Sequence, residues 1–134
     1  MSKMIFKNKN TLAVDAVPSS FKLPAGFEET RGSHITVLDP ADGKKMKTKN
    51  NWSNKQLDAW LATFEGSRIA GQPERLGIGH AKQDGLEAYY EVIEWPEAQS
   101  WRVSLCFEPK DLHITIGVLG GDPHDVSKGR ETLI

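Results

Sequence analysis

The chain has 134 residues, a formal net charge of −1 at pH 7 and a single cysteine, Cys106. This length suits one compact domain, and the near-zero net charge excludes a strongly basic nucleic-acid-binding protein. One cysteine excludes an intramolecular disulfide, and the sequence shows neither a signal-peptide pattern nor an apolar run of about 20 residues, so we expect a cytoplasmic protein without a membrane partner.

The first part of the chain predicts two strands. Residues 1–10 are polar and are expected to be flexible at the start of a single domain. Residues 11–17 alternate in polarity, which indicates a short strand that Pro18 ends. Residues 33–38, SHITVL, form a second apolar run and predict a second strand.

A lysine-rich segment follows at residues 38–52 and is predicted to be a loop. Its four lysines are Lys44, Lys45, Lys47 and Lys49. A solvated surface is the ordinary interpretation of such a run. The alternative is a clamp for a ligand phosphate or an RNA backbone.

The clearest helix signal lies in residues 53–66. Ser53 and Gln56 have the spacing of a capping box, and Gly66 is well placed to end the helix. Apolar residues at positions i, i+3, i+4 and i+7 form one stripe: Leu57, Trp60, Leu61 and Phe64.

The second half of the chain predicts a hairpin and another helix. Two strand-like runs, 76–83 and 86–95, flank a Gln-Asp-Gly turn. Pro96 suits the first turn of a helix that Glu108-Pro109 ends. We expect Cys106, at the end of this helix, to be a buried thiol.

The tripeptide His-Ile-Thr occurs twice, at residues 34–36 and 113–115, each time inside a strand-like apolar run. Side chains alternate faces along a strand, so the histidine and threonine share one face and the neighbouring aliphatic residues share the other. We expect the aliphatic face to pack into a core and the His-Thr face to stay accessible. Gly117 is expected to leave open space beside Thr115.

Two imidazoles and two hydroxyls that meet at one site suit a phosphodiester. A neutral histidine accepts a proton from the nucleophile, while a protonated histidine donates one to the leaving oxygen. Which histidine takes which role stays open. Threonine hydroxyls donate to the non-bridging oxygens. The alternatives are two structural core histidines, or a metal site, although no local spacing matches a metal motif. That metal site would use His34, His113 and His124 with Asp122 or Asp125.

Four further residues are candidates for substrate contact. Trp52 and Tyr90 carry rings on which a base can stack, although core packing is the ordinary role of such residues. Lys128 can bind a phosphate, and His124 lies in a glycine-rich loop before the polar tail. Solvation is the ordinary interpretation for both of these polar residues.

The two motifs resemble those of the 2H phosphoesterases, which carry two His-x-Thr/Ser-x motifs on separate strands. Here HITV (34–37) and HITI (113–116) match, and their histidines lie 79 positions apart (113 minus 34). The resemblance covers residues 11–119. The tail at 122–124, Asp-Pro-His, is similar to an Asp-x-His element of an RNA-repair-like branch. Some phage members of the family degrade cyclic oligonucleotide signals.

The resemblance implies a bilobal, pseudo-twofold α+β fold, with antiparallel sheets around a central groove and helices packed outside. It implies metal-independent action, without a cofactor, on 2′,3′-cyclic or 2′-5′ phosphodiesters of RNA ends or small cyclic oligonucleotides, with ligation as the possible reverse. By the same resemblance His34 and His113 are catalytic, and Thr36 and Thr115 bind phosphate. The alternative is a non-catalytic nucleotide- or RNA-binding module that uses the same groove. The sequence indicates no oligomeric state.

Overall fold

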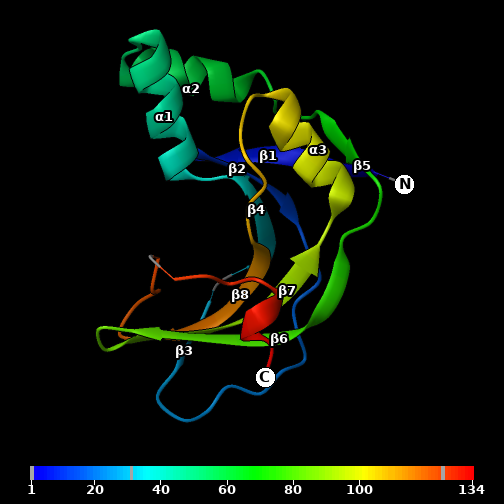
Figure 1. Ribbon diagram of the computed structural model, residues 1–134, viewed down its shortest axis with the longest axis vertical. Coiled ribbons are helices and arrows are strands. Elements are labelled where there is room, and N and C mark those ends of the chain that lie inside the picture. Colours follow the sequence, from blue (N-terminus) through cyan, green and yellow to red (C-terminus); the bar gives the residue numbers. More distant parts are fainter. Residues whose placement is uncertain (1, 31, 125) are drawn as a thin grey trace. The chain divides into compact units, whose positions relative to one another are not determined.

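The computed structural model describes residues 2–30, 32–124 and 126–134. The chain divides into two compact units, each assembled from three segments. Unit 1 comprises Met1–Asp15, Thr36–Gln72 and Pro96–Lys110, and unit 2 comprises Ala16–Ile35, Pro73–Trp95 and Asp111–Ile134. The described residues form two four-stranded antiparallel sheets and three α-helices (Figure 1), which confirms the predicted α+β class.

The first sheet has the strand order β4-β2-β1-β5. Its strands are β1 (Ser2–Asn8), β2 (Thr11–Asp15), β4 (His34–Leu38) and β5 (Arg68–Ala70). Within residues 1–10, which the sequence predicts to be flexible, Ser2–Asn8 form β1, and this strand pairs with β2 on one side and with β5 on the other. Ile5, opposite Val14, is 1% exposed and is the one buried residue of the strand, whose other two apolar residues, Met4 and Phe6, are exposed or partly exposed.

The lysine-rich segment is not the predicted loop but helix α1, Pro40–Asn50. Asp39 is the N-cap, and a reciprocal capping box joins it to Asp42: each backbone N–H donates to the other residue's carboxylate, at 2.8 and 3.0 Å. Pro40 at the first helical position is preorganised for a helix start. Asn51 adopts a left-handed conformation and ends the helix.

The predicted helix after Ser53 is confirmed as α2, Asn54–Ala62. The Ser53 N–H donates to the Gln56 side chain at 2.8 Å, and the Gln56 N–H donates to the Ser53 hydroxyl at 3.2 Å. Leu57 and Leu61 are buried, as the apolar stripe predicts. The helix ends at Ala62, before Gly66, and further turns fill the interval.

The second predicted helix is confirmed as α3, Pro96–Ser104. Its buried residues are Ala98 and Arg102. After the helix, Cys106 adopts a left-handed conformation with φ of 66°, which lets the Phe107 N–H donate back to the Arg102 carbonyl at 3.0 Å. This position turns the thiol outward, so Cys106 is exposed and the expectation of a buried thiol is wrong.

The sheet of unit 2 has the order β3-β8-β7-β6. Its strands are β3 (Glu28–Glu29), β6 (Glu74–Gln83), β7 (Leu86–Glu94) and β8 (Leu112–Leu119). The predicted hairpin is confirmed: Asp84 and Gly85, both with positive φ, connect β6 to β7 in a tight turn. The predicted C-terminal strand is confirmed as β8.

A β-bulge interrupts the pairing of β7 with β8. Tyr89 pairs with Gly117 and Tyr90 pairs with Thr115, so Ile116 is the extra residue. The bulge ends the simple alternation, and Gly117 is buried rather than beside open space. A Cβ at Gly117 would lie 2.3 Å from the Leu23 side chain and 2.8 Å from the Glu28 carbonyl oxygen. The glycine therefore allows the close approach of β3, which corrects our expectation.

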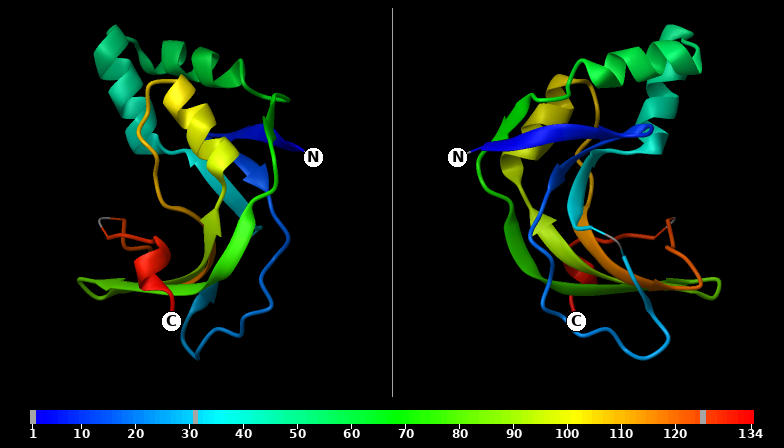
Figure 2. Two further views of the ribbon diagram at one scale, coloured as in Figure 1. Left: turned by 45° about the vertical axis from the view of Figure 1, so that its right-hand side comes forward. Right: turned by 180° about the vertical axis from the view of Figure 1, so that it is seen from behind.

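The polar tail folds back onto the sheet of unit 2. The terminal 3-10 turn η1 (Arg130–Thr132) contacts β6, and Figure 2 shows it (red) along the β6–β7 hairpin. Leu133 forms a β-bridge with Gly79, and the Ile134 N–H donates to the Ile78 carbonyl at 2.9 Å. The tail is thus an integral layer of unit 2.

Candidate active site

Both His-Ile-Thr motifs lie on strands with the predicted alternation. On β4, Ile35 and Val37 are 1% and 0% exposed, whereas His34 and Thr36 are partly exposed. This pattern places the imidazole and the hydroxyl on the accessible face of the strand and the aliphatic side chains in the core.

The same alternation holds on β8 before its bulge. Ile114 is 1% exposed, while His113 and Thr115 are partly exposed. Because neither motif imidazole is buried, the interpretation of both histidines as core residues does not describe this structure. His34, His113 and Thr115 belong to unit 2, whereas Thr36 is assigned to unit 1.

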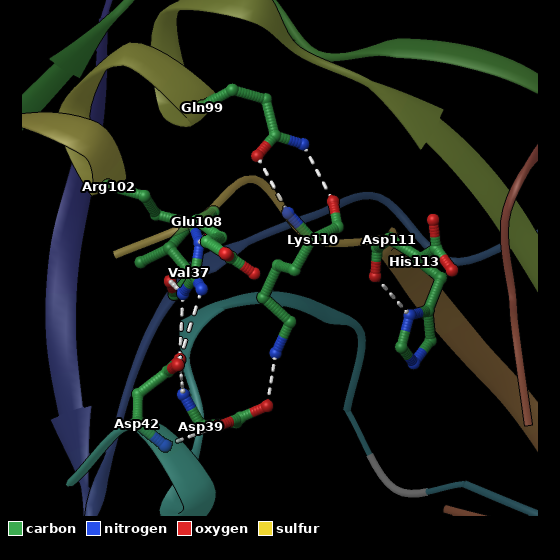
Figure 3. Close-up of polar contacts among 9 residues, drawn as sticks. All are labelled: Val37, Asp39, Asp42, Gln99, Arg102, Glu108, Lys110, Asp111 and His113. Carbon is green, nitrogen blue, oxygen red and sulfur yellow. Dashed lines mark hydrogen bonds and ion pairs between the residues drawn. The ribbon is translucent and has the colours of Figure 1, made fainter. Parts of the chain in front are cut away.

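Asp111 and Tyr90, both in unit 2, contact the His113 ring. Its Nδ1 lies 3.1 Å from the Asp111 carbonyl oxygen (Figure 3). A carbonyl only accepts hydrogen bonds, so Nδ1 is the donor and carries a proton. In the neutral ring Nε2 is then the unprotonated, basic nitrogen. The ring of Tyr90 lies edge-on to the imidazole, with centroids 5.6 Å apart.

Tyr90 does not offer a stacking surface to a substrate, because it is 0% exposed. Its hydroxyl donates to the Thr132 hydroxyl at 2.8 Å. Burial raises the pKa of the Tyr90 phenol above its ordinary value, so the group stays protonated and donates at neutral pH. The expected substrate contact is thus corrected: Tyr90 pairs with Thr115 and shares the face of His113, but the C-terminal tail covers it there, while Tyr89 lies on the other face.

The two tail candidates have different surroundings. His124 is exposed in the segment after β8, where solvent reaches it freely. Lys128 is 6% exposed, and its ammonium pairs with Asp122 at 2.6 Å. The same ammonium lies 5.9 Å from the centre of the Tyr90 ring. The expected solvation of Lys128 is wrong, and its charge is already neutralised by a carboxylate.

Trp52 belongs to unit 1, in the connection between α1 and α2. Its ring packs on Trp60 with centroids 5.8 Å apart, and Trp60 in turn contacts Phe64 at 5.0 Å. Phe64 continues the contact to Trp101 at 5.7 Å. Trp52 is therefore the partly exposed end of an aromatic cluster. It packs against other side chains, as the ordinary interpretation of this residue predicts.

A buried ion pair in unit 1, which the sequence did not indicate, joins the end of β4 to the segment leading into β8 (Figure 3). The Arg102 guanidinium donates to the Asp42 carboxylate at 2.7 and 3.2 Å and to the Val37 carbonyl at 2.9 Å. Its Nε donates to the Glu108 carbonyl at 2.9 Å. The one sequence signal for this ion pair was the spacing of Arg102, four positions after Ala98, which places Arg102 on the same, buried face of α3.

A second link in unit 1 holds Lys110, three positions before His113. Gln99 forms two hydrogen bonds with the Lys110 backbone, at 2.7 and 3.0 Å, and the Lys110 ammonium pairs with Asp39. Desolvation of the Asp39 carboxyl opposes its ionisation, but hydrogen bonds from Lys110 and the Asp42 backbone outweigh it and lower the Asp39 pKa. Asp39 is thus ionised at neutral pH and caps α1 while it binds Lys110.

The alternative of a metal centre finds no support among the residues that the structure describes. Within them, no group of three or more His, Cys, Asp or Glu side chains is placed to hold a metal ion. Asp125, one of the carboxylates considered for such a site, lies outside the described residues. In the same part of the chain no helix is long and apolar enough to cross a membrane.

A family model described as "Swiss Army Knife, 2H phosphoesterase domain" matches residues 6–124, a range that contains both His-x-Thr motifs. The chain belongs to the 2H phosphoesterase family. Searches of curated proteins and of solved structures found no match. Membership of the 2H phosphoesterases supports a phosphodiesterase-type activity in general.

Proposed function

We propose that this 2H phosphoesterase is a metal-independent phosphodiesterase that opens a 2′,3′-cyclic or 2′-5′ phosphodiester of an RNA end or a small cyclic oligonucleotide. The observation that carries the proposal is the matched environment of the motifs. Each partly exposed imidazole shares a strand face with a partly exposed threonine hydroxyl, and buried aliphatic residues back both.

In the proposed reaction, one neutral imidazole accepts a proton from the attacking water as its oxygen bonds to phosphorus. The other, as imidazolium, donates a proton to the leaving ribose oxygen as its bond to phosphorus breaks. Hydrogen bonds from Thr36 and Thr115 stabilise the charge that grows on the non-bridging oxygens. The bond between His113 Nδ1 and the Asp111 carbonyl supports Nε2 as the nitrogen that exchanges the proton. Either histidine can begin the reaction as the base.

The test is an assay of the purified chain with EDTA present. Three substrate classes are offered: 2′,3′-cyclic nucleotides, 2′-5′-linked oligonucleotides and cyclic dinucleotides. We expect turnover of at least one class and a bell-shaped dependence of kcat/KM on pH, because one histidine must be neutral and the other protonated for the reaction to begin. Absence of turnover on all three, or a rate that is flat from about pH 5 to 9, would contradict acid–base work by two histidines.

A nucleic-acid-binding function is the second candidate, and α1 is the observation that favours it. The helix carries Lys44, Lys45, Lys47 and Lys49, and its one acidic residue, Asp42, is buried against Arg102. The exposed charges of α1 are therefore all positive, which suits the phosphates of an RNA strand.

We expect the affinity for a single-stranded RNA oligonucleotide to fall steeply with salt if α1 contacts its phosphates. Replacing Lys44 and Lys45 by glutamine should then reduce the slope of log affinity against log salt by about 1.4, because each lost phosphate contact removes about 0.7. The matched control replaces the exposed lysines Lys9 and Lys22, and its slope should stay that of the wild type. Equal slopes for both double variants would exclude α1 as the RNA contact.

A further inference from the structure

The C-terminal tail contacts two residues that in turn contact His113. The family match ends at residue 124, so Ser127–Thr132 lie beyond the shared 2H phosphoesterase domain. All the contacts concerned lie within unit 2. The tail reaches His113 through Asp111 on one side and through Tyr90 on the other.

The first route runs through Asp111. The Lys128 backbone N–H donates to Asp111 Oδ2 at 3.2 Å, and the Ser127 hydroxyl lies 3.0 Å from the same oxygen and also contacts the Glu131 carboxylate. The tail backbone is close here, because a Cβ on Gly129 would lie 2.7 Å from Asp111 Oδ1. The side chain of Asp111 is thus held by the tail, while its backbone carbonyl accepts the hydrogen bond from His113 Nδ1 at 3.1 Å. Moving Asp111 moves the acceptor that determines the tautomer of the imidazole.

The second route runs through Tyr90. Its hydroxyl donates to Thr132, whose own hydroxyl donates to the Gly129 carbonyl at 2.7 Å. The Tyr90 ring lies directly over Gly79, where a Cβ would come within 2.4 Å of it, and the Lys128 ammonium faces the ring. The ring is therefore confined on several sides, and its edge-on contact restricts the plane of the His113 imidazole.

We infer that Ser127 and Thr132 are positioning residues for His113: through Asp111 and Tyr90 they hold the imidazole in the Nδ1-protonated tautomer and in one plane, so that Nε2 serves the phosphodiester. This inference rests on the proposed function, because it assigns the tail to the same histidine. It adds a part of the site that lies outside the matched domain.

The closing experiment separates positioning from simple stabilisation. Ser127→Ala and Thr132→Val each delete one hydroxyl, and Ser127→Thr and Thr132→Ser restore it. The matched controls are Ser104→Ala, which removes a local bond to the Trp101 carbonyl, and Tyr89→Phe, which alters the neighbour of Tyr90 on the other face. For each variant we would measure the His113 tautomer by ring ¹⁵N NMR, the melting temperature, and kcat and KM on the best substrate of the panel.

We expect both hydroxyl deletions to lower the Nδ1-protonated fraction of His113 and to lower kcat about tenfold, with KM within about twofold, since a misplaced catalytic group costs rate rather than binding. The restoring variants should recover both quantities, and both controls should match the wild type. An unchanged His113 tautomer and unchanged kcat in both deletions would overturn the inference. Wild type without turnover would instead refute the proposed function, and the NMR measurement would still decide whether the tail positions the ring.

Discussion

Replacement of His34 or of His113 by alanine is expected to lower kcat by about 10²- to 10⁴-fold on the substrate that the wild type turns over. Each imidazole carries one of the two proton transfers, so the loss of either leaves one transfer without a partner. The effect should fall on kcat rather than on KM, because the proton transfers occur in the transition state. Steady-state kinetics in EDTA, with each variant at the pH optimum of the wild type, measures it.

The fold should survive both histidine substitutions, since both side chains are partly exposed and each strand is anchored by its buried aliphatic face. The matched control is His80→Ala. His80 also lies on a strand and is partly exposed, but it pairs with Glu87 at 2.8 Å and packs on the Tyr89 ring, and neither of these residues belongs to a motif. Wild-type rates in both motif variants, or an equal loss in the His80 variant, would refute the assignment of the motif histidines as the catalytic pair.

Replacement of Arg102 by methionine is expected to lower the free energy of unfolding by about 3–5 kcal/mol. Arg102 and Asp42 are 3% and 5% exposed, so removal of the guanidinium leaves a buried carboxylate without its counter-ion. The carbonyl oxygens of Val37 and Glu108 lose their donor in the same step. Urea unfolding at pH 7, followed by tryptophan fluorescence, measures the change.

Two comparisons test the cause of this loss. The double variant Arg102→Met with Asp42→Asn should lose less than the sum of the two single variants, because the neutral amide no longer needs the guanidinium. Arg130→Met breaks an exposed pair with Glu94, at 65% and 47% side-chain exposure, and should cost no more than about 1 kcal/mol. A loss for Arg102→Met as small as that for Arg130→Met would show that the buried network contributes little.

Elements whose geometry is determined by residues close to them in the sequence were predicted correctly. The capping box of Ser53 and Gln56, and the turn at Asp84 and Gly85, use bonds and backbone angles within four residues, so the sequence contains all of the information. Helix α1 was missed although Asp39 and Asp42 form an equivalent box, because its lysine-rich surface lacks the apolar stripe that indicates an amphipathic helix. Strand β1 was missed because one buried residue, Ile5, is too weak a pattern.

The sequence by itself determined which side chains share a face of each motif strand, because alternation is a property of the extended backbone and the buried isoleucines select the register. Only the tertiary structure decided what surrounds those faces. Tyr90 meets Thr132 across 42 positions, and Arg102 meets Asp42 across 60. Contacts of this kind arise when distant segments close on one another and pack, and no local spacing encodes which polar group will meet which partner.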